Sequence, residues 1–115
     1  MFRGEIRWVE LGQALSGEPA RRRPAVIVSN DGANSSAALL GRGVITVVPM
    51  TSNVTRVYPF QVLLPAQASG LDWDSKAQAE QVRSVSVERV REPLGSVPAP
   101  LMLELDEALR VHLAL

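Results

Sequence analysis

Two polar residues stand where strand-like apolar segments meet loops, and their chemistry is the most informative feature of the sequence. Arg23 directly precedes Pro24 and the apolar run AVIV, and Thr51 directly follows the segment VVPM. A proline holds the residue before it in extended geometry, so Arg23 has a defined backbone at the start of its segment. If residues 23–29 and 43–51 pair as antiparallel strands, the start of one lies beside the end of the other. Arg23 and Thr51 are then neighbours.

A fixed guanidinium beside a hydroxyl suits a phosphodiester substrate. The arginine fork stabilises the charge of a pentavalent phosphorane, and the hydroxyl donates a hydrogen bond to a non-bridging oxygen. A simpler interpretation stays open, in which Arg23 is a surface arginine of a basic loop and Thr51 hydrogen-bonds within its own turn. Only the spatial arrangement of the two side chains distinguishes these interpretations.

The composition excludes most other kinds of active site. The chain has 115 residues and no cysteine, which rules out thiolate metal sites, thiol nucleophiles and disulfides. It has one histidine, which excludes His-rich metal sites and most Ser–His chemistry. Asp72 and Asp74 flank Trp73 in a turn, and two alternating carboxylates alone make a poor metal site. The C-terminal acids and His112 fit a solvated or packed helix face.

The length and the average globular composition predict one soluble domain over residues 1–115. The formal net charge is zero, but residues 1–57 contain seven arginines against four acids, at positions 3, 7, 21, 22, 23, 42 and 56 against 5, 10, 18 and 31. No apolar run approaches the about 18 residues of a membrane span, and the N-terminus has no signal-peptide pattern. We therefore expect a cytoplasmic protein.

Short strands must position the arginine and the threonine. Alternating or β-branched segments predict strands at residues 4–11, 23–29, 43–51, 58–64 and 90–97. Pro49 indicates that the third strand leaves its ladder near its end or lies at an edge.

The connections are less regular. Residues 13–22 and 69–74 are predicted as a loop and a turn, residues 30–43 as a small polar segment with one helical turn near 35–40, and residues 77–87 fit either strand or helix. Apolar residues at helical spacing from Leu101 to His112 predict a C-terminal helix, with Pro100 in its first turn. The fold class is therefore mainly β, a strongly bent sheet or half-open barrel with a helix laid across it.

Several sequence blocks together resemble the MazF/PemK family of toxin endoribonucleases. The blocks occur in the family's order and cover nearly the whole chain: RGEIRWVEL, RRRPAVIVSND, VITVVPMTSN, VYPFQVLL, AEQVRSV and LDEALRVHLAL. The resemblance implies an SH3-like barrel of the CcdB/PemK type with short helices and a C-terminal α-helix, working as a homodimer. It also implies metal-independent, cofactor-free cleavage of single-stranded RNA at short sequence motifs, without the ribosome.

The resemblance assigns roles to particular residues. Arg23 and Thr51 match the family's catalytic arginine and threonine. The positions expected to contact substrate are Glu18, Ser52, Asn53, Arg56 and Gln81. The implied reaction is attack by the RNA 2′-hydroxyl, which leaves a 2′,3′-cyclic phosphate and a 5′-hydroxyl, and the implied partner is an acidic antitoxin of the MazE type.

Two alternatives remain at this point. A CcdB-like toxin has the same type of fold but acts on gyrase rather than on RNA. A catalytically silent SH3-like binding module would also fit the pattern of strands, although it gives no reason for Arg23 and Thr51 to occur together.

Overall fold

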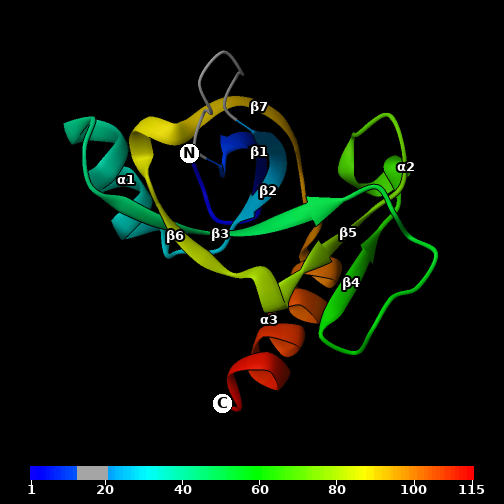
Figure 1. Ribbon diagram of the computed structural model, residues 1–115. Coiled ribbons are helices and arrows are strands. Elements are labelled where there is room, and N and C mark those ends of the chain that lie inside the picture. Colours follow the sequence, from blue (N-terminus) through cyan, green and yellow to red (C-terminus); the bar gives the residue numbers. More distant parts are fainter. Residues whose placement is uncertain (13–20) are drawn as a thin grey trace.

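A strongly bent antiparallel sheet forms most of the molecule (Figure 1). The computed structural model describes residues 1–12 and 21–115. Its strands are β1 (Glu5–Glu10), β2 (Arg22–Ile27), β3 (Val44–Thr51), β4 (Gln61–Leu64), β5 (Ser75–Gln78), β6 (Arg83–Ser86) and β7 (Val90–Ser96). The order is β4-β5-β3-β2-β1-β7, with β6 also paired to β3. Within the described chain the end strands β4 and β7 do not pair, so the sheet is not a closed barrel, and the predicted mainly β class with a C-terminal helix is confirmed.

Strand β3 loses its β2 partner near its end, and this loss creates space for a site. Its pairing with β2 ends at Ala25 opposite Pro49, whereas Met50 and Thr51 pair with β5. Proline has no N–H to donate, so a ladder is readily interrupted there. The prediction that Pro49 marks a departure from the ladder is confirmed, and Thr51 lies just beyond the end of the β2 ladder, paired with β5 on the other edge of β3.

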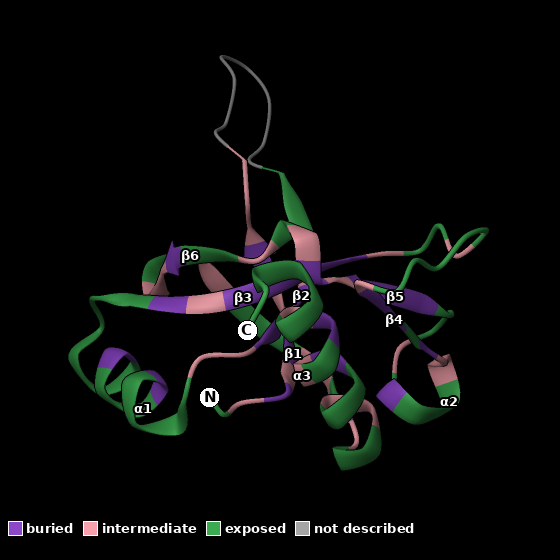
Figure 2. Cartoon of the chain, turned by 90° about the horizontal axis from the view of Figure 1, so that it is seen from below, coloured by how far each residue is buried: buried purple, intermediate pink, exposed green. Residues whose placement is uncertain are grey.

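Alternate residues of β2 and β3 enter two apolar clusters on opposite faces of the sheet. Val26 and Val48 belong to one cluster, together with Leu105 of the C-terminal helix, whereas Ala25 and Val47 belong to the other. This burial of both faces explains why the two strands are continuous apolar runs rather than alternating ones. The buried positions are concentrated on the strands in Figure 2.

The helices occupy the periphery of the sheet. Helix α1 (Asp31–Leu40) and the short α2 (Ala66–Ser69) lie at opposite ends of it (Figure 1). Helix α3 (Ala99–Leu113) packs against β4 and the 3₁₀ turn η1 (Ala79–Gln81). A second 3₁₀ turn, η2, spans Val87–Arg89. The expectation of a single turn near 35–40 was wrong, because the Asn30 side chain caps Ala33 N–H at 2.8 Å and starts a full helix. In the described part of the chain, no helix is long and apolar enough to cross a membrane.

Other elements refine the sequence predictions. Helix α2 precedes the predicted turn at 69–74 and was not foreseen, and the ambiguous segment 77–87 is strand, 3₁₀ turn and strand in succession. The predicted C-terminal helix is confirmed, with Pro100 in its first turn and His112 exposed near its end.

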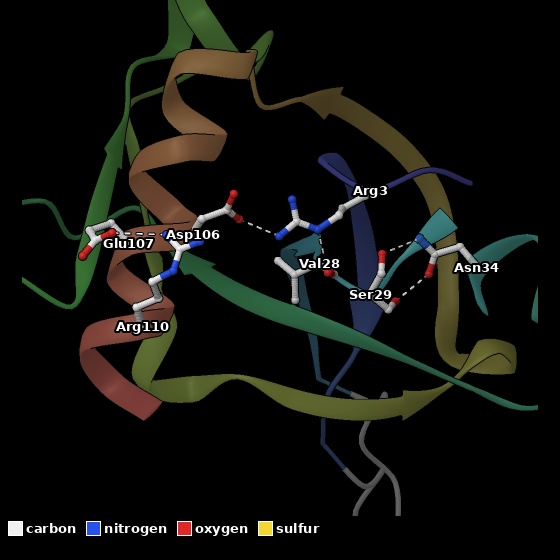
Figure 3. A network of polar contacts seen from close by, with 7 residues as sticks. All are labelled: Arg3, Val28, Ser29, Asn34, Asp106, Glu107 and Arg110. Atoms are coloured by element: carbon white, nitrogen blue, oxygen red, sulfur yellow. Dashed lines mark hydrogen bonds and ion pairs between the residues drawn. The ribbon is translucent and has the colours of Figure 1, made fainter. Parts of the chain in front are cut away.

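An N-terminal arginine joins α3 to the sheet. Arg3 donates from Nη2 to Oδ1 of Asp106 at 2.6 Å and from Nε to the carbonyl of Val28 at 2.9 Å (Figure 3). Beside it, Asn34 of α1 donates to the carbonyl of Ser29 at 2.8 Å. These contacts join the middle of α3 to the C-terminal end of β2, which is the end away from Arg23.

Candidate active site

A cavity of about 260 Å³ opens where β2 and β3 separate. Arg23 and Thr51 both line it, and so do residues of β1, of the loop after β3 and of the approach to β5. The full lining is Trp8, Arg22, Arg23, Pro24, Met50, Thr51, Ser52, Trp73 and Ser75. The structure therefore brings the two principal candidate residues to one site.

The register of the strands explains this arrangement. β2 and β3 are antiparallel, as the sequence predicts, and Ala25 is opposite Pro49. Two residues further along the same register, Arg23 would be opposite Thr51, and opposed residues project to the same face of an antiparallel pair. Because the ladder between β2 and β3 ends at Pro49, and Thr51 pairs with β5 on the opposite edge of β3, the side chains at these positions border an opening instead of a continuous ladder.

Arg23 has hydrogen-bond donors free for a ligand. Its side chain is exposed, and among the described residues it forms no ion pair. Its neighbour Arg22 differs, because its guanidinium lies 3.3 Å from Glu92 and 3.9 Å from Glu10. Of these two adjacent arginines in the same cavity, Arg23 is the one whose charge the described carboxylates leave uncompensated.

Thr51 is held in place by the turn that follows it. Its Oγ1 accepts the backbone N–H of Asn53 at 3.3 Å, and Oδ1 of Asn53 accepts the N–H of Thr55 at the same distance. The hydroxyl oxygen is thereby positioned as an acceptor, and the hydroxyl proton remains available to donate. The local turn expected from the simpler interpretation is present, and it is compatible with a role in the cavity.

A second, basic cavity of about 190 Å³ adjoins the first. Arg23 lines both of them, and the second is completed by Leu11, Gly12, Arg21, Pro49, Gln81 and Arg83. Arg83 donates to the carbonyl of Leu11 at 2.9 Å, which holds its guanidinium at the cavity wall. No carboxylate belongs to the described lining, so the surface here attracts anions.

The remaining predicted contacts have different positions. Ser52 lines the first cavity and Gln81 the second. Asn53 and Arg56 are on the loop after β3 and line neither, and Arg56 Nη1 donates to the Tyr58 hydroxyl at 3.2 Å. Glu18 lies outside the described residues.

Several lining residues were not predicted from sequence. The two tryptophans, Trp8 and Trp73, are the largest of them, and Trp73 is 56% exposed. The only local signal for Trp73 was a large aromatic residue between Asp72 and Asp74 in a polar turn. Among the residues that the structure describes, no cluster of three or more potential metal ligands occurs.

Comparison with known proteins identifies the family. A family model described as the PemK-like, MazF-like toxin of type II toxin-antitoxin systems matches residues 2–113. The chain belongs to this toxin family. A MazF-like relative, Endoribonuclease MazF9 of Mycobacterium tuberculosis, is 58% identical over 115 residues, which are 100% of this chain and 98% of the relative.

Solved MazF structures have the same fold. The chain matches a MazE–MazF complex of Deinococcus radiodurans with a TM-score of 0.72 at 27% identity, covering 100% of this chain and 96% of that one. It also matches a mycobacterial endoribonuclease in complex with its cognate antitoxin, with a TM-score of 0.78 at 22% identity and coverage of 100% and 96%. This MazF-like fold places the ends of β2 and β3 at the candidate site.

Proposed function

We propose that this chain is the toxin of a type II toxin-antitoxin pair and acts as an endoribonuclease on single-stranded RNA. The observation that carries the proposal is the shared cavity of Arg23, which has no carboxylate partner among the described residues, and Thr51, whose hydroxyl oxygen is oriented by Asn53. The relative at 58% identity is named an endoribonuclease, which supports the same reaction class. One domain acting in the cytoplasm, where RNA is present, accounts for this activity.

The reaction uses a nucleophile that the substrate supplies. The RNA 2′-oxygen forms a bond to the adjacent phosphorus while the bond from phosphorus to the 5′-oxygen breaks, giving a 2′,3′-cyclic phosphate and a 5′-hydroxyl. The proton of the 2′-hydroxyl passes to solvent, and the leaving oxygen takes up a proton. DNA has no 2′-hydroxyl and is not cleaved.

Arg23 stabilises charge in this reaction rather than acting as a base. A guanidinium remains protonated at neutral pH and cannot accept a proton from the 2′-hydroxyl. Its donors instead bind the phosphorane oxygens or the leaving oxygen, where negative charge develops. Thr51 donates to a non-bridging oxygen and orients the phosphate for attack opposite the leaving group.

The nucleotides that flank the cleaved linkage contact the protein surface around the cavity. Ser52 and Gln81 border the two cavities next to Arg23, and Asn53 and Arg56 follow on the exposed loop. Glu18 joins this group through the family pattern. Because the net charge of the chain is zero, affinity for RNA depends on this local basic surface.

The same basic surface fits an acidic antitoxin segment that folds over the site and blocks RNA. Solved complexes of MazE with MazF support this partner. A homodimer is the assembly proposed for the toxin, in keeping with the family pattern.

The direct test is incubation of the purified chain with a mixed single-stranded RNA pool in EDTA. We expect cleavage at short motifs, with fragments ending in 2′,3′-cyclic phosphate and 5′-hydroxyl, and no cleavage of DNA of the same sequence. Intact RNA together with trapped gyrase–DNA complexes would instead support a gyrase-directed toxin. Cleavage that EDTA abolishes would contradict the metal-independent mechanism.

A further inference from the structure

Neither of the two tryptophans at the cavity has a role in the mechanism above, and Trp73 is the more exposed of them. Trp73 lies in the loop between α2 and β5, remains 56% exposed, and lines the same cavity as Arg23 and Thr51. A tryptophan left largely in water contributes little to the stability of the fold. Its position at the mouth of a polar site therefore calls for a ligand that covers it.

The loop that carries Trp73 is held at both ends. Oδ1 of Asp74 accepts the backbone N–H of Ala66 at 2.8 Å, and Ser75, which is 2% exposed, begins strand β5. The end of helix α2 lies in close contact with β7. The contact is so close that a Cβ on Gly95 of β7 would overlap the carbonyl oxygen of Ser69. The indole is thus presented to the cavity from a fixed support.

The chemistry of the cavity specifies the ligand that covers the indole. Arg23 and Thr51 form a phosphate-binding end, and the hydroxyls of Ser52 and Ser75 can each donate or accept a hydrogen bond. A nucleobase joined to the bound phosphate has a flat π-face for the indole and a polar edge for hydroxyls. The carboxylates of an acidic peptide would use the arginine, but they offer no extended π-face to Trp73.

We propose that Trp73 stacks on a nucleobase next to the cleaved linkage and is a substrate-binding residue of this chain. The inference rests on the proposed RNA cleavage, and it adds a defined base-stacking subsite to the cavity. Stacking is tolerant of base identity because every base has a π-face, so Trp73 contributes affinity while the surrounding hydroxyls contribute selectivity.

The first experiment compares the cleavage kinetics of Trp73→Ala, Trp73→Phe and Phe2→Ala on a short RNA with one cleavage site. Phe2 is a matched control, since it is 50% exposed and lines neither cavity. We expect KM to rise about fivefold to a hundredfold in Trp73→Ala, with a smaller change in kcat. Trp73→Phe should recover most of the affinity, and Phe2→Ala should match the wild type. An unchanged KM in Trp73→Ala would overturn the inference.

A series of RNAs with one abasic position each identifies the partner of the indole. At the stacked position, loss of the base should weaken wild-type binding but have little further effect on Trp73→Ala, because the interaction is already absent. A penalty for Trp73→Ala that is the same on every abasic RNA would show that the tryptophan acts through the structure of the loop, and would overturn the proposal.

Binding without cleavage separates this inference from the proposed function. An RNA with a 2′-deoxy group at the cleavage site should quench tryptophan fluorescence in the wild type, and the quench should shrink in Trp73→Phe. Such a result supports the stacking subsite even where cleavage is not observed. A quench of equal size in Trp73→Phe would contradict it, and a quench produced by an acidic peptide but not by this RNA would assign the indole to the antitoxin instead.

Discussion

Two groups of arginines in this molecule have the same chemistry but different surroundings. Arg3 and Arg91 each meet a carboxylate from a distant segment, Asp106 at 2.6 Å and Glu10 at 2.9 Å. Arg23, at the start of β2, forms no such pair among the described residues and faces a cavity with Thr51. Arginines of the first kind join elements of the fold, whereas Arg23 has a guanidinium that no described carboxylate pairs with. Composition alone, with eleven arginines in the chain, does not separate the two groups.

The largest expected difference between the groups is catalytic. Arg23→Ala should lower the rate of RNA cleavage by about a hundredfold to a thousandfold, since loss of one preorganised donor to a developing charge has effects of this size. Arg91→Ala removes a paired arginine that lines neither cavity and should leave the rate near that of the wild type. Single-turnover kinetics on one RNA measure both. Equal losses of cleavage rate in Arg23→Ala and Arg91→Ala would show that pairing with a carboxylate does not separate the arginines by function.

Thr51 should show a smaller catalytic effect. Thr51→Val removes the hydroxyl with little change in shape, and one hydrogen bond to a charged group corresponds to about a tenfold to hundredfold loss in rate. Thr51→Ser keeps the hydroxyl and should retain most of the activity. The same single-turnover assay applies, and a Thr51→Val variant as fast as Thr51→Ser would exclude the proposed donor role.

The paired arginine Arg3 should affect stability instead of cleavage. Arg3→Met removes the contacts to Asp106 and to the carbonyl of Val28 (Figure 3), and should lower the free energy of unfolding by about 1 to 2 kcal/mol. Urea denaturation measures this change, and the cleavage rate of the folded variant should remain close to wild type. A large loss of cleavage rate with an unchanged free energy of unfolding would show that Arg3 acts in catalysis and not in stabilising the fold.

The smallest expected effect is the pH dependence of the pair between Glu10 and Arg91. The hydrogen bond from Arg91 lowers the pKa of the Glu10 carboxyl below its usual 4.5. A carboxyl with a lowered pKa in the folded state adds stability above its unfolded pKa, and loses it as the pH falls through the folded value. The difference in urea midpoint between wild type and Glu10→Gln should therefore be small at pH 7 and smaller still at about pH 3. A difference that grows on acidification would reverse the assigned sign.

The sequence predicted the strands that carry the site, because their apolar runs and their prolines are local signals. Residues 23–29 and 43–51 were recognisable for this reason, and so was the departure of the chain near Pro49. The pairing of Met50 and Thr51 with β5, on the edge of β3 away from β2, depends on long-range contacts, which no local pattern reports. Helix α1 was underestimated because its start depends on one capping side chain, Asn30.

The lining of the site was less predictable than its two principal residues. Arg23 and Thr51 were found from strand ends and from the family pattern, whereas Trp73 approaches the cavity from a loop anchored by Asp74 to α2. Arg83 reaches the second cavity through its bond to the carbonyl of Leu11, 72 residues away in sequence. Contacts of this kind follow from tertiary packing, and spacing along the chain does not encode them.

The proposed mechanism requires Arg23 and Thr51 to act together on one phosphate. A double-mutant cycle of single-turnover cleavage rates with Arg23→Ala, Thr51→Val and the combined variant tests it most directly. We predict that the combined loss is smaller than the product of the single losses by about tenfold or more, as expected for groups that contact the same reacting centre. A combined loss equal to that product would show that the two residues act independently, and would contradict their joint action on one phosphate.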